Sequence, residues 1–293
     1  MEIGIHTENF HDMNGHRPGR DALREKGYAE MRAAGFDCAD LTAMCDVKLP
    51  FYTADLATAK AMAREERAVA EAAGIRIHQV HGLWPTDDKT AENRKQKRID
   101  MERSIRLTPC FGSRYLVIHP DMPFGWGTEA DPAFAYKTNL ELFRALMPIA
   151  EEEGVIVCIE NMPMKAHALS PAKRMYEFVC EIGHPNLGMC LDTGHANVFG
   201  HDCGDIVRMI APVLKTLHVH DNMGEKDQHL APFSGTVNWD SFTDALREVG
   251  FDGVFSIETC LDIKDMTKEG HFEGAKKLAQ IARQLADRAE KGR

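Results

Sequence analysis

Short apolar segments that end in a histidine or a carboxylate recur along this chain of 293 residues. Six of them end at positions separated by intervals of 26 to 41 residues: His81, His119, Glu160, Asp192, His218 and Glu258. An interval of this length holds one β-strand, one helix and their two loops. The chain is therefore constrained to a repeated strand–helix fold that collects polar strand ends at one edge of its sheet.

The expected strands and helices alternate along the chain. Apolar runs predict strands at residues 1–6, 36–41, 75–81, 113–119, 155–160, 187–192, 214–220 and 253–258. Helical periodicity, caps and terminal glycines predict helices at residues 21–34, 53–73, 90–110, 132–153, 171–182, 205–210, 238–249 and 267–290. We therefore predict an α/β fold in which residues 1–293 form a single (β/α)8 TIM-barrel domain. A doubly wound open sheet is the alternative, but no Gly-rich dinucleotide turn favours it.

The alternation of side chains along each strand predicts which of them face the barrel axis. Cys158, Cys190 and Ser256 each lie two positions before a carboxylate that ends its strand. These small side chains are expected to point into the barrel below the functional residues. The neighbouring apolar side chains are expected to face the helices: Val157, Ile159, Leu191, Phe255 and Ile257.

Composition and charge restrict the class of partner. The formal net charge of −10 gives no general attraction to a polyanion, so nucleic acid is disfavoured as a partner. No apolar run approaches the roughly 18 residues of a membrane span, and residues 1–10 do not resemble a signal peptide. Eight scattered cysteines without a C-x-x-C pair predict reduced thiols. These features predict a cytoplasmic protein that does not bind a membrane.

Four of the strand-end residues predict a metal site: Glu160, Asp192, His218 and Glu258. Three carboxylates at one rim would repel one another unless a cation neutralised them. Their oxygen and nitrogen donors suit Mn²⁺, Zn²⁺, Co²⁺ or Mg²⁺. We predict one divalent metal ion, with Mn²⁺ as the first expectation, and no further cofactor because no P-loop or nicotinamide fingerprint is present.

Five segments carry a family resemblance: E-N-M at 160–162, L-D-T-G-H at 191–195, H-V-H-D-N at 218–222, D-Q-H-L-A-P-F-S-G-T-V-N-W at 227–239 and S-I-E-T at 256–259. They resemble the xylose-isomerase-like TIM-barrel superfamily of sugar phosphate isomerases and epimerases, which also includes the endonuclease IV type of apurinic endonuclease. The resemblance covers essentially the whole chain and is closest from residue 155 to residue 260. It is specific for the superfamily but not for a substrate.

The isomerase and ketose 3-epimerase branch implies a metal-dependent proton transfer on a ketose or related carbonyl sugar. The resemblance implies that Glu160, Asp192, His218 and Glu258 hold one metal ion, which stabilises an enediolate. It assigns Glu160 and Glu258 as the paired base and acid that remove and return the proton. The residues expected to contact the sugar are His81, His119, His195, Asp227, His229, Trp84 and Trp126. His6, Asp40 and His220 are further candidates at the rim.

Three other functions remain open. The endonuclease branch implies a three-zinc phosphodiesterase and matches His81, His119, Glu160, Asp192, His195, His218, Asp227, His229 and Glu258. The acidic net charge and the lack of a Lys and Arg cluster in the rim loops argue against it. A lyase or dehydratase, including one that cleaves oxidised glycosides, would share the proton removal and use His119 or His81 as an extra acid or base. A metal- and sugar-binding accessory subunit is the non-enzymatic alternative, and fold analogy adds a homo-oligomer as an expected partner.

Overall fold

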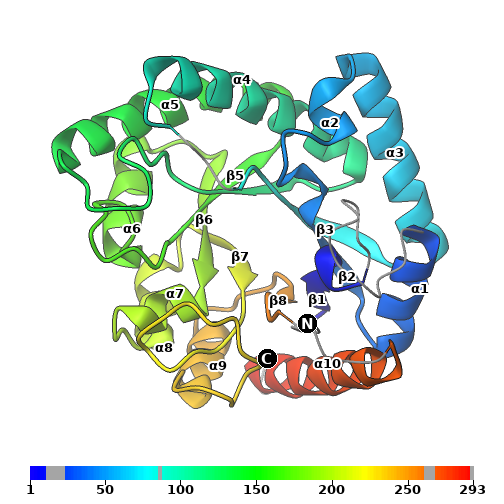
Figure 1. The fold of residues 1–293 in the computed structure, drawn as a ribbon. Coiled ribbons are helices and arrows are strands. Elements are labelled where there is room, and N and C mark those ends of the chain that lie inside the picture. The colour runs from blue at the N-terminus through cyan, green and yellow to red at the C-terminus, as the bar shows by residue number, and fades with distance from the viewer. Residues whose placement is uncertain (11–23, 85–87, 261–267, 291–293) are drawn as a thin grey trace.

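Eight parallel strands surround one axis and are enclosed by helices in the computed structural model, which describes residues 1–10, 24–84, 88–260 and 268–290 (Figure 1). The strands are β1 (Ile3–His6), β2 (Cys38–Leu41), β3 (Arg76–His81), β4 (Tyr115–Ile118), β5 (Ile156–Glu160), β6 (Leu187–Asp192), β7 (Leu214–His218) and β8 (Phe255–Ile257). They neighbour one another in the order β7-β6-β5-β4-β3-β2-β1-β8.

The two ends of this sheet meet between β7 and β8. Val219 and Ile257 form a parallel bridge, and Val219 N–H donates to Ser256 O at 2.8 Å while Glu258 N–H donates to Val219 O at 3.0 Å. The predicted (β/α)8 barrel is therefore confirmed. That residues 1–293 form one domain stays a prediction.

Helices cover the outside of the barrel, and α10 closes the ring beside α1 and α9 (Figure 1). The α-helices are α1 (Arg24–Ala34), α2 (Pro50–Thr53), α3 (Leu56–Ala72), α4 (Ala91–Leu107), α5 (Pro132–Glu152), α6 (Ala172–Ile182), α7 (Thr193–Val198), α8 (Cys203–Ile210), α9 (Trp239–Glu248) and α10 (Lys268–Glu290). Short 3-10 helices lie at η1 (Thr7–Asn9), η2 (Thr42–Met44) and η3 (Thr108–Phe111). Within the described residues, no helix has the length and apolarity needed to cross a membrane.

Several element boundaries differ from the sequence prediction by one to three residues. The helix expected over residues 53–73 begins three residues later, at Leu56, because the Asp55 side chain accepts a hydrogen bond from Thr58 N–H and caps α3 there. The strand expected over residues 214–220 ends at His218. Helix α7 was not predicted, and residues 21–23 of the first expected helix lie outside the described part of the chain.

Two apolar clusters occupy the two faces of the barrel wall. Val117, Ile156, Cys158 and Cys190 pack together inside the barrel. The outer cluster, between strands and helices, includes Val157, Ile159, Leu191, Phe255 and Ile257. The predicted alternation of the side chains is therefore confirmed. The same alternation directs the polar side chains at the C-terminal strand ends into the barrel interior.

A buried ion cluster connects the loops after β3 and β4 to helix α4. Lys97 Nζ lies 2.9 Å from Asp88 Oδ2 and 2.6 Å from Asp121 Oδ1, and all three side chains are buried. Asp88 also accepts a hydrogen bond from Met122 N–H at 2.9 Å. These contacts hold Asp88 and Asp121, which follow β3 and β4, against helix α4.

We expect Lys97→Met to lower the free energy of unfolding by about 3–5 kcal/mol, because it leaves two buried carboxylates without their cation. Urea denaturation measures the loss. Lys95→Met, on the exposed side of the same helix, is the matched control and should change stability little. Equal stabilities for the two variants would contradict this structural role of Lys97.

Candidate metal centre and active site

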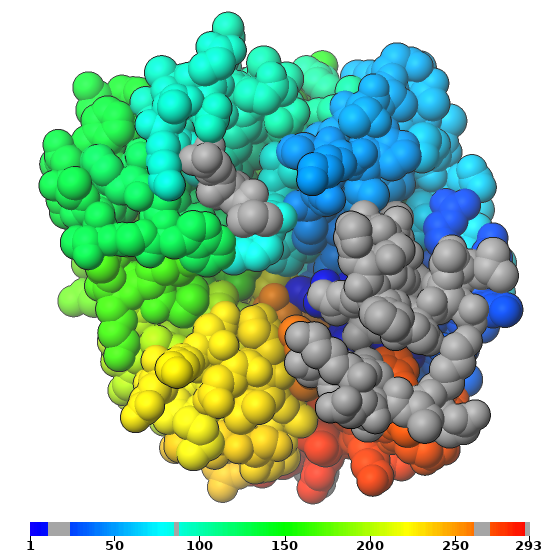
Figure 2. Space-filling view, in the orientation of Figure 1, coloured from blue at the N-terminus to red at the C-terminus, as the bar shows by residue number. Residues whose placement is uncertain are grey.

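A cavity of about 310 Å³ lies at the C-terminal ends of the strands. Figure 2 shows the hollow at the middle of this face, where segments from the beginning, middle and end of the chain meet. Its walls are lined by His6, Glu8, Thr42, Cys45, His81, Trp84, His119, Trp126, Glu160, Met162, Pro163, Met164, His195, Asp227, His229, Glu258 and Cys260. The structure thus places every residue predicted to contact sugar at one cavity.

The first cluster at this cavity consists of Glu160, Asp192, His218 and Glu258, and one ligand atom from each lies within 4.8 Å of the others. His218 Nδ1 lies 3.1 Å from Glu160 Oε1 and 3.0 Å from Glu258 Oε2. All three atoms are buried, and none of them makes a hydrogen bond. Buried donor atoms without hydrogen-bond partners that meet at one point fit a bound cation, so the donor set is suited to a divalent metal ion.

Two carboxyl groups of the first cluster, those of Glu160 and Glu258, are stabilised in their ionised form by nearby positive charge. Burial raises the pKa of Glu160, but the charges of His218 and His119 outweigh burial and hold this pKa well below its usual range. The pKa of Glu258 is likewise raised by burial but held low, chiefly by the charges of His218 and His6. Both carboxylates are therefore ionised, as metal ligands must be.

Asp40 orients the imidazole of this cluster. His218 Nε2 donates to Asp40 Oδ2 at 2.9 Å, and the same oxygen accepts from Gln79 Nε2 at 2.6 Å. Because Nε2 is bound to Asp40, the Nδ1 atom of His218 faces the carboxylates of Glu160 and Glu258. Since a metal-binding histidine commonly gives its other ring N–H to a carboxylate, Asp40 completes the arrangement expected of a metal site.

A second cluster consists of His195, His220, Asp227 and His229, whose ligand atoms also lie within 4.8 Å of one another. Asp227 Oδ2 lies 3.1 Å from His195 Nε2 and 3.0 Å from His229 Nε2. Burial lowers the pKa of His195, but Asp192 and Asp227 reverse this effect and raise it to about 10. His220, one of the further rim candidates, donates to Asp192 Oδ2 at 3.0 Å and so links the two clusters.

Two further histidines approach Glu160 from β3 and the end of β4. His119 Nε2 lies 3.1 Å from Glu160 Oε2, and His81 Nε2 lies 3.8 Å from the same oxygen. Burial and the neighbouring His119 lower the pKa of His81 to about 4, so its ring is neutral near pH 7. His81, Glu160 and His218 form a third group of potential ligands.

An aromatic and sulfur-rich wall covers one side of the cavity. The rings of Trp84 and Trp126 meet edge to face with centroids 4.5 Å apart, and Trp84 meets His119 at the same distance. Met162 and Met164 also line the cavity. The ring centroid of Phe233 lies 6.1 Å from that of Trp239, and Phe233 does not line this cavity. Among the described lining residues there is no lysine or arginine.

Several motif residues hold the candidate ligands in place. Asn161 pairs with the backbone of Asp192 through two hydrogen bonds of 2.9 and 3.0 Å, and its carbonyl lies 2.7 Å from His195 Nδ1. Asp221 accepts from Trp239 Nε1 and Val237 N–H, which anchors the loop that carries the second cluster. These roles depend on the folded loops, and residue type alone gave no signal for them.

Residues 28–285 match the model of the xylose isomerase-like TIM barrel family, and the chain belongs to this family. It is 25% identical to the ketose 3-epimerase of Arthrobacter globiformis over 88% of this chain and 83% of that protein. A crystal structure of D-psicose 3-epimerase determined in the presence of D-fructose shares the fold over 100% of both chains, with a TM-score of 0.78 and 19% identity.

Two other relatives match about half of the chain. The uncharacterized protein MJ1311 of Methanocaldococcus jannaschii is 32% identical over 53% of this chain and 54% of its own length. A probable endonuclease 4 of Mesomycoplasma hyopneumoniae is 29% identical over 53% of this chain and 57% of its own length. The family therefore includes relatives named for both sugar and nucleic-acid chemistry.

The absence of a side chain at Gly194 leaves room for the His220 ring between the two clusters. A Cβ at residue 194 would lie 1.9 Å from His220 Cε1, and helix α7 begins beside it because Asp192 Oδ1 accepts from His195 N–H at 2.6 Å. We therefore expect Gly194→Ala to displace His220, which would disturb Asp192 and weaken Mn²⁺ binding about tenfold or more. Calorimetric titration with Mn²⁺ measures the change.

The matched control for this variant is Gly127→Ala, because no atom lies within 4 Å of a Cβ at residue 127. It should bind Mn²⁺ as the unchanged protein does. Unchanged Mn²⁺ affinity in a folded Gly194→Ala protein would show that the position of His220 does not matter to the cluster.

Proposed function

We propose that this protein is a divalent-metal-dependent epimerase or isomerase that moves a proton on an unphosphorylated ketose or related carbonyl sugar. The observation that carries the proposal is the first cluster at a small cavity that has an aromatic wall and no described lysine or arginine. A phosphate group on the substrate is commonly bound by such cations. The ketose 3-epimerase relative and the fold shared with D-psicose 3-epimerase also support sugar chemistry.

Glu160, Asp192, His218 and Glu258 would hold the metal ion through the donor atoms that meet at the cavity floor. When bound, a divalent ion supplies Lewis acidity toward a carbonyl group, which acidifies the adjacent C–H bond. Asp40 keeps His218 in the required orientation, and Asn161 keeps Asp192 in place. The remaining chemistry is the movement of one proton by side chains of this protein.

Glu160 and Glu258 are suited to move this proton. They lie on two sides of His218 Nδ1, and the Glu258 side chain is 11% exposed whereas that of Glu160 is 1% exposed. Each has a second oxygen directed away from the cluster centre: Glu160 Oε2 faces His119, and Glu258 Oε1 lies 3.9 Å from His6. One carboxylate removes the proton and the other returns it from the opposite side, which inverts the carbon centre.

The walls of the cavity orient the sugar and exclude water. Trp84 and Trp126 present ring faces and edges suited to the apolar C–H side of a sugar. His195, Asp227 and His229 offer hydrogen-bond groups on another side of the cavity, where sugar hydroxyl groups would bind. The cavity volume of about 310 Å³ suits a small molecule.

A three-metal phosphodiesterase is the second candidate, and the presence of a second cluster of potential ligands beside the first favours it. The probable endonuclease 4 relative also supports it. An enzyme that acts on DNA must neutralise several phosphates, yet the described lining of the cavity holds no cation and the chain carries a net charge of −10. We therefore give sugar chemistry precedence.

We expect Glu258→Gln and Glu160→Gln each to lower turnover of the best ketose by at least about 100-fold, because each removes a proton acceptor. The assay is incorporation of deuterium from D2O into the ketose, followed by NMR across D-psicose, D-tagatose, D-fructose and L-ribulose with Mn²⁺. Glu141→Gln, an exposed residue of α5, is the matched control and should retain full exchange.

Full deuterium exchange in either folded variant would remove that residue from the proton transfer. Absence of exchange with every ketose in the Mn²⁺-loaded, unchanged protein would overturn the proposed function itself.

A further inference from the structure

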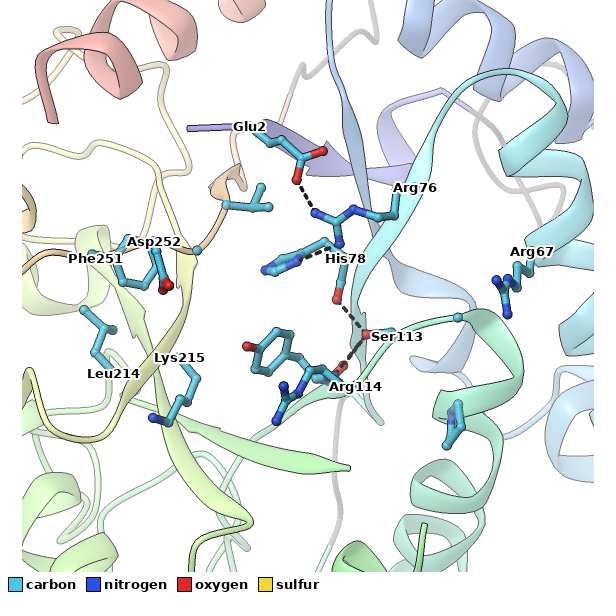
Figure 3. Close-up of a pocket in the computed structure, with 15 residues that line it drawn as sticks. Glu2, Arg67, Arg76, His78, Ser113, Arg114, Leu214, Lys215, Phe251 and Asp252 are labelled. Carbon is cyan, nitrogen blue, oxygen red and sulfur yellow. Dashed lines mark hydrogen bonds and ion pairs between the residues drawn. The ribbon is translucent and has the colours of Figure 1, made fainter. Parts of the chain in front are cut away.

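A second cavity, of about 600 Å³, is shown in Figure 3. It lies at the N-terminal ends of the strands, whereas the cavity of the candidate active site lies at their C-terminal ends. This second cavity is formed where β3, β4, β7 and β8 begin, and it is lined by Glu2, Arg67, Arg76, His78, Pro109, Gly112, Ser113, Arg114, Tyr115, Leu214, Lys215, Phe251, Asp252, Gly253 and Val254. Residues at this end of a TIM barrel normally serve stability and not catalysis. The proposed sugar chemistry uses none of them.

Positive charge predominates at this lower cavity, in a protein with a net charge of −10. Arg67, Arg76, Arg114 and Lys215 face only two carboxylates, Glu2 and Asp252. Glu2 is occupied by an ion pair with Arg76, and Arg67 pairs with Glu71 on α3.

Arg114 and Lys215 make no ion pair with any carboxylate in the described residues, although Asp252 lines the same cavity. The Arg114 guanidinium instead lies 5.5 Å from the centre of the Tyr115 ring. Two cations of this cavity are therefore available to an anionic ligand.

His78 adds a buried donor. Its Nδ1 lies 3.3 Å from Arg76 Nη1, and because a guanidinium only donates hydrogen bonds, Nδ1 must accept. Burial lowers the pKa of His78 to about 4, so the ring is neutral and its one proton lies on Nε2. That Nε2 is buried and has no hydrogen-bond partner, and the His78 side chain is 6% exposed. Figure 3 shows the ring directed into the cavity toward Lys215 and Asp252.

Gly188 lets Lys215 reach this cavity. A Cβ at residue 188 would lie 2.4 Å from Lys215 Cγ, so only glycine leaves room for the lysine side chain there. The strand register shifts at this point, between Met189 and Cys190. Leu214, Phe251 and Val254 give the cavity an apolar wall.

We propose that the lower cavity binds a small organic oxyanion, a phosphate or carboxylate attached to an apolar group. Arg114 and Lys215 bind the charged oxygens, because guanidinium and ammonium groups form charge-assisted hydrogen bonds with such anions. The His78 Nε2–H donates to a further oxygen, which satisfies an otherwise unpaired buried group. The apolar wall packs against the organic part, and the volume lies within the range of small-molecule sites.

Isothermal titration calorimetry with phenyl phosphate and with benzoate tests the proposal, using the full chain at constant ionic strength. We expect saturable binding of at least one anion and none of phenol, which lacks the charge. Arg114→Met and Lys215→Met should each weaken binding about tenfold. Lys137→Met, an exposed lysine of α5, removes the same charge elsewhere and should leave the affinity unchanged.

The two probes identify the oxyanion: preference for phenyl phosphate assigns a phosphate ligand, and preference for benzoate assigns a carboxylate. His78→Phe keeps a ring of similar shape without the N–H group and should also weaken binding; if it fails to fold, the Arg114 and Lys215 variants decide. No saturable binding of either anion would overturn the proposal. So would equal affinities in the unchanged protein, Arg114→Met and Lys215→Met, because binding would then lie elsewhere.

Discussion

The imidazole of His218 holds together two carboxylates in the barrel interior, that of Glu160 in β5 and that of Glu258 directly after β8. Its Nδ1 lies 3.1 Å from Glu160 and 3.0 Å from Glu258, and Asp40 holds the opposite ring nitrogen at 2.9 Å. Bringing ionised carboxylates together in a buried site is costly unless positive charge accompanies them. Other contacts at the C-terminal end of the barrel keep these groups together. Gln79 donates a hydrogen bond to Asp40, and the bridge between Val219 and Ile257 places Glu258 beside His218. A divalent cation would meet the same requirement more completely.

The convergence of Glu160, Asp192, His218 and Glu258 could be predicted from the sequence because parallel strands in a barrel end on one rim. Side-chain alternation was predictable for the same reason, and Cys158 and Cys190 do face the inside. Helix α7 escaped prediction because it is six residues long and starts from the carboxylate of Asp192. The contact of Asp40 with His218 joins residues 178 positions apart, and only the closed barrel creates it. His220 was a candidate at the rim, but its contact with Asp192 could not be predicted, because the position of its ring depends on the absence of a side chain at Gly194.

The lining of the cavity, and not the set of candidate metal ligands, distinguishes a sugar enzyme from a nuclease. The same carboxylates and histidines suit one metal ion or three, and the family contains relatives named for both activities. What differs is the requirement for charge: a phosphodiester needs cations around it, whereas a neutral sugar needs aromatic faces and hydrogen-bond groups. Trp84 and Trp126 beside a lining without described cations favour the sugar. The cations gather instead at the opposite end of the barrel.

The central claim is that the Glu160–Asp192–His218–Glu258 cluster holds one divalent metal ion. Elemental analysis of the protein after saturation with Mn²⁺ or Zn²⁺ and removal of excess ion tests this claim most directly, together with an assay for nicking of abasic DNA. The account predicts one ion per chain, lost in Asp192→Asn, and no nicking. Three tightly held zinc ions per chain with nicking of abasic DNA would contradict it.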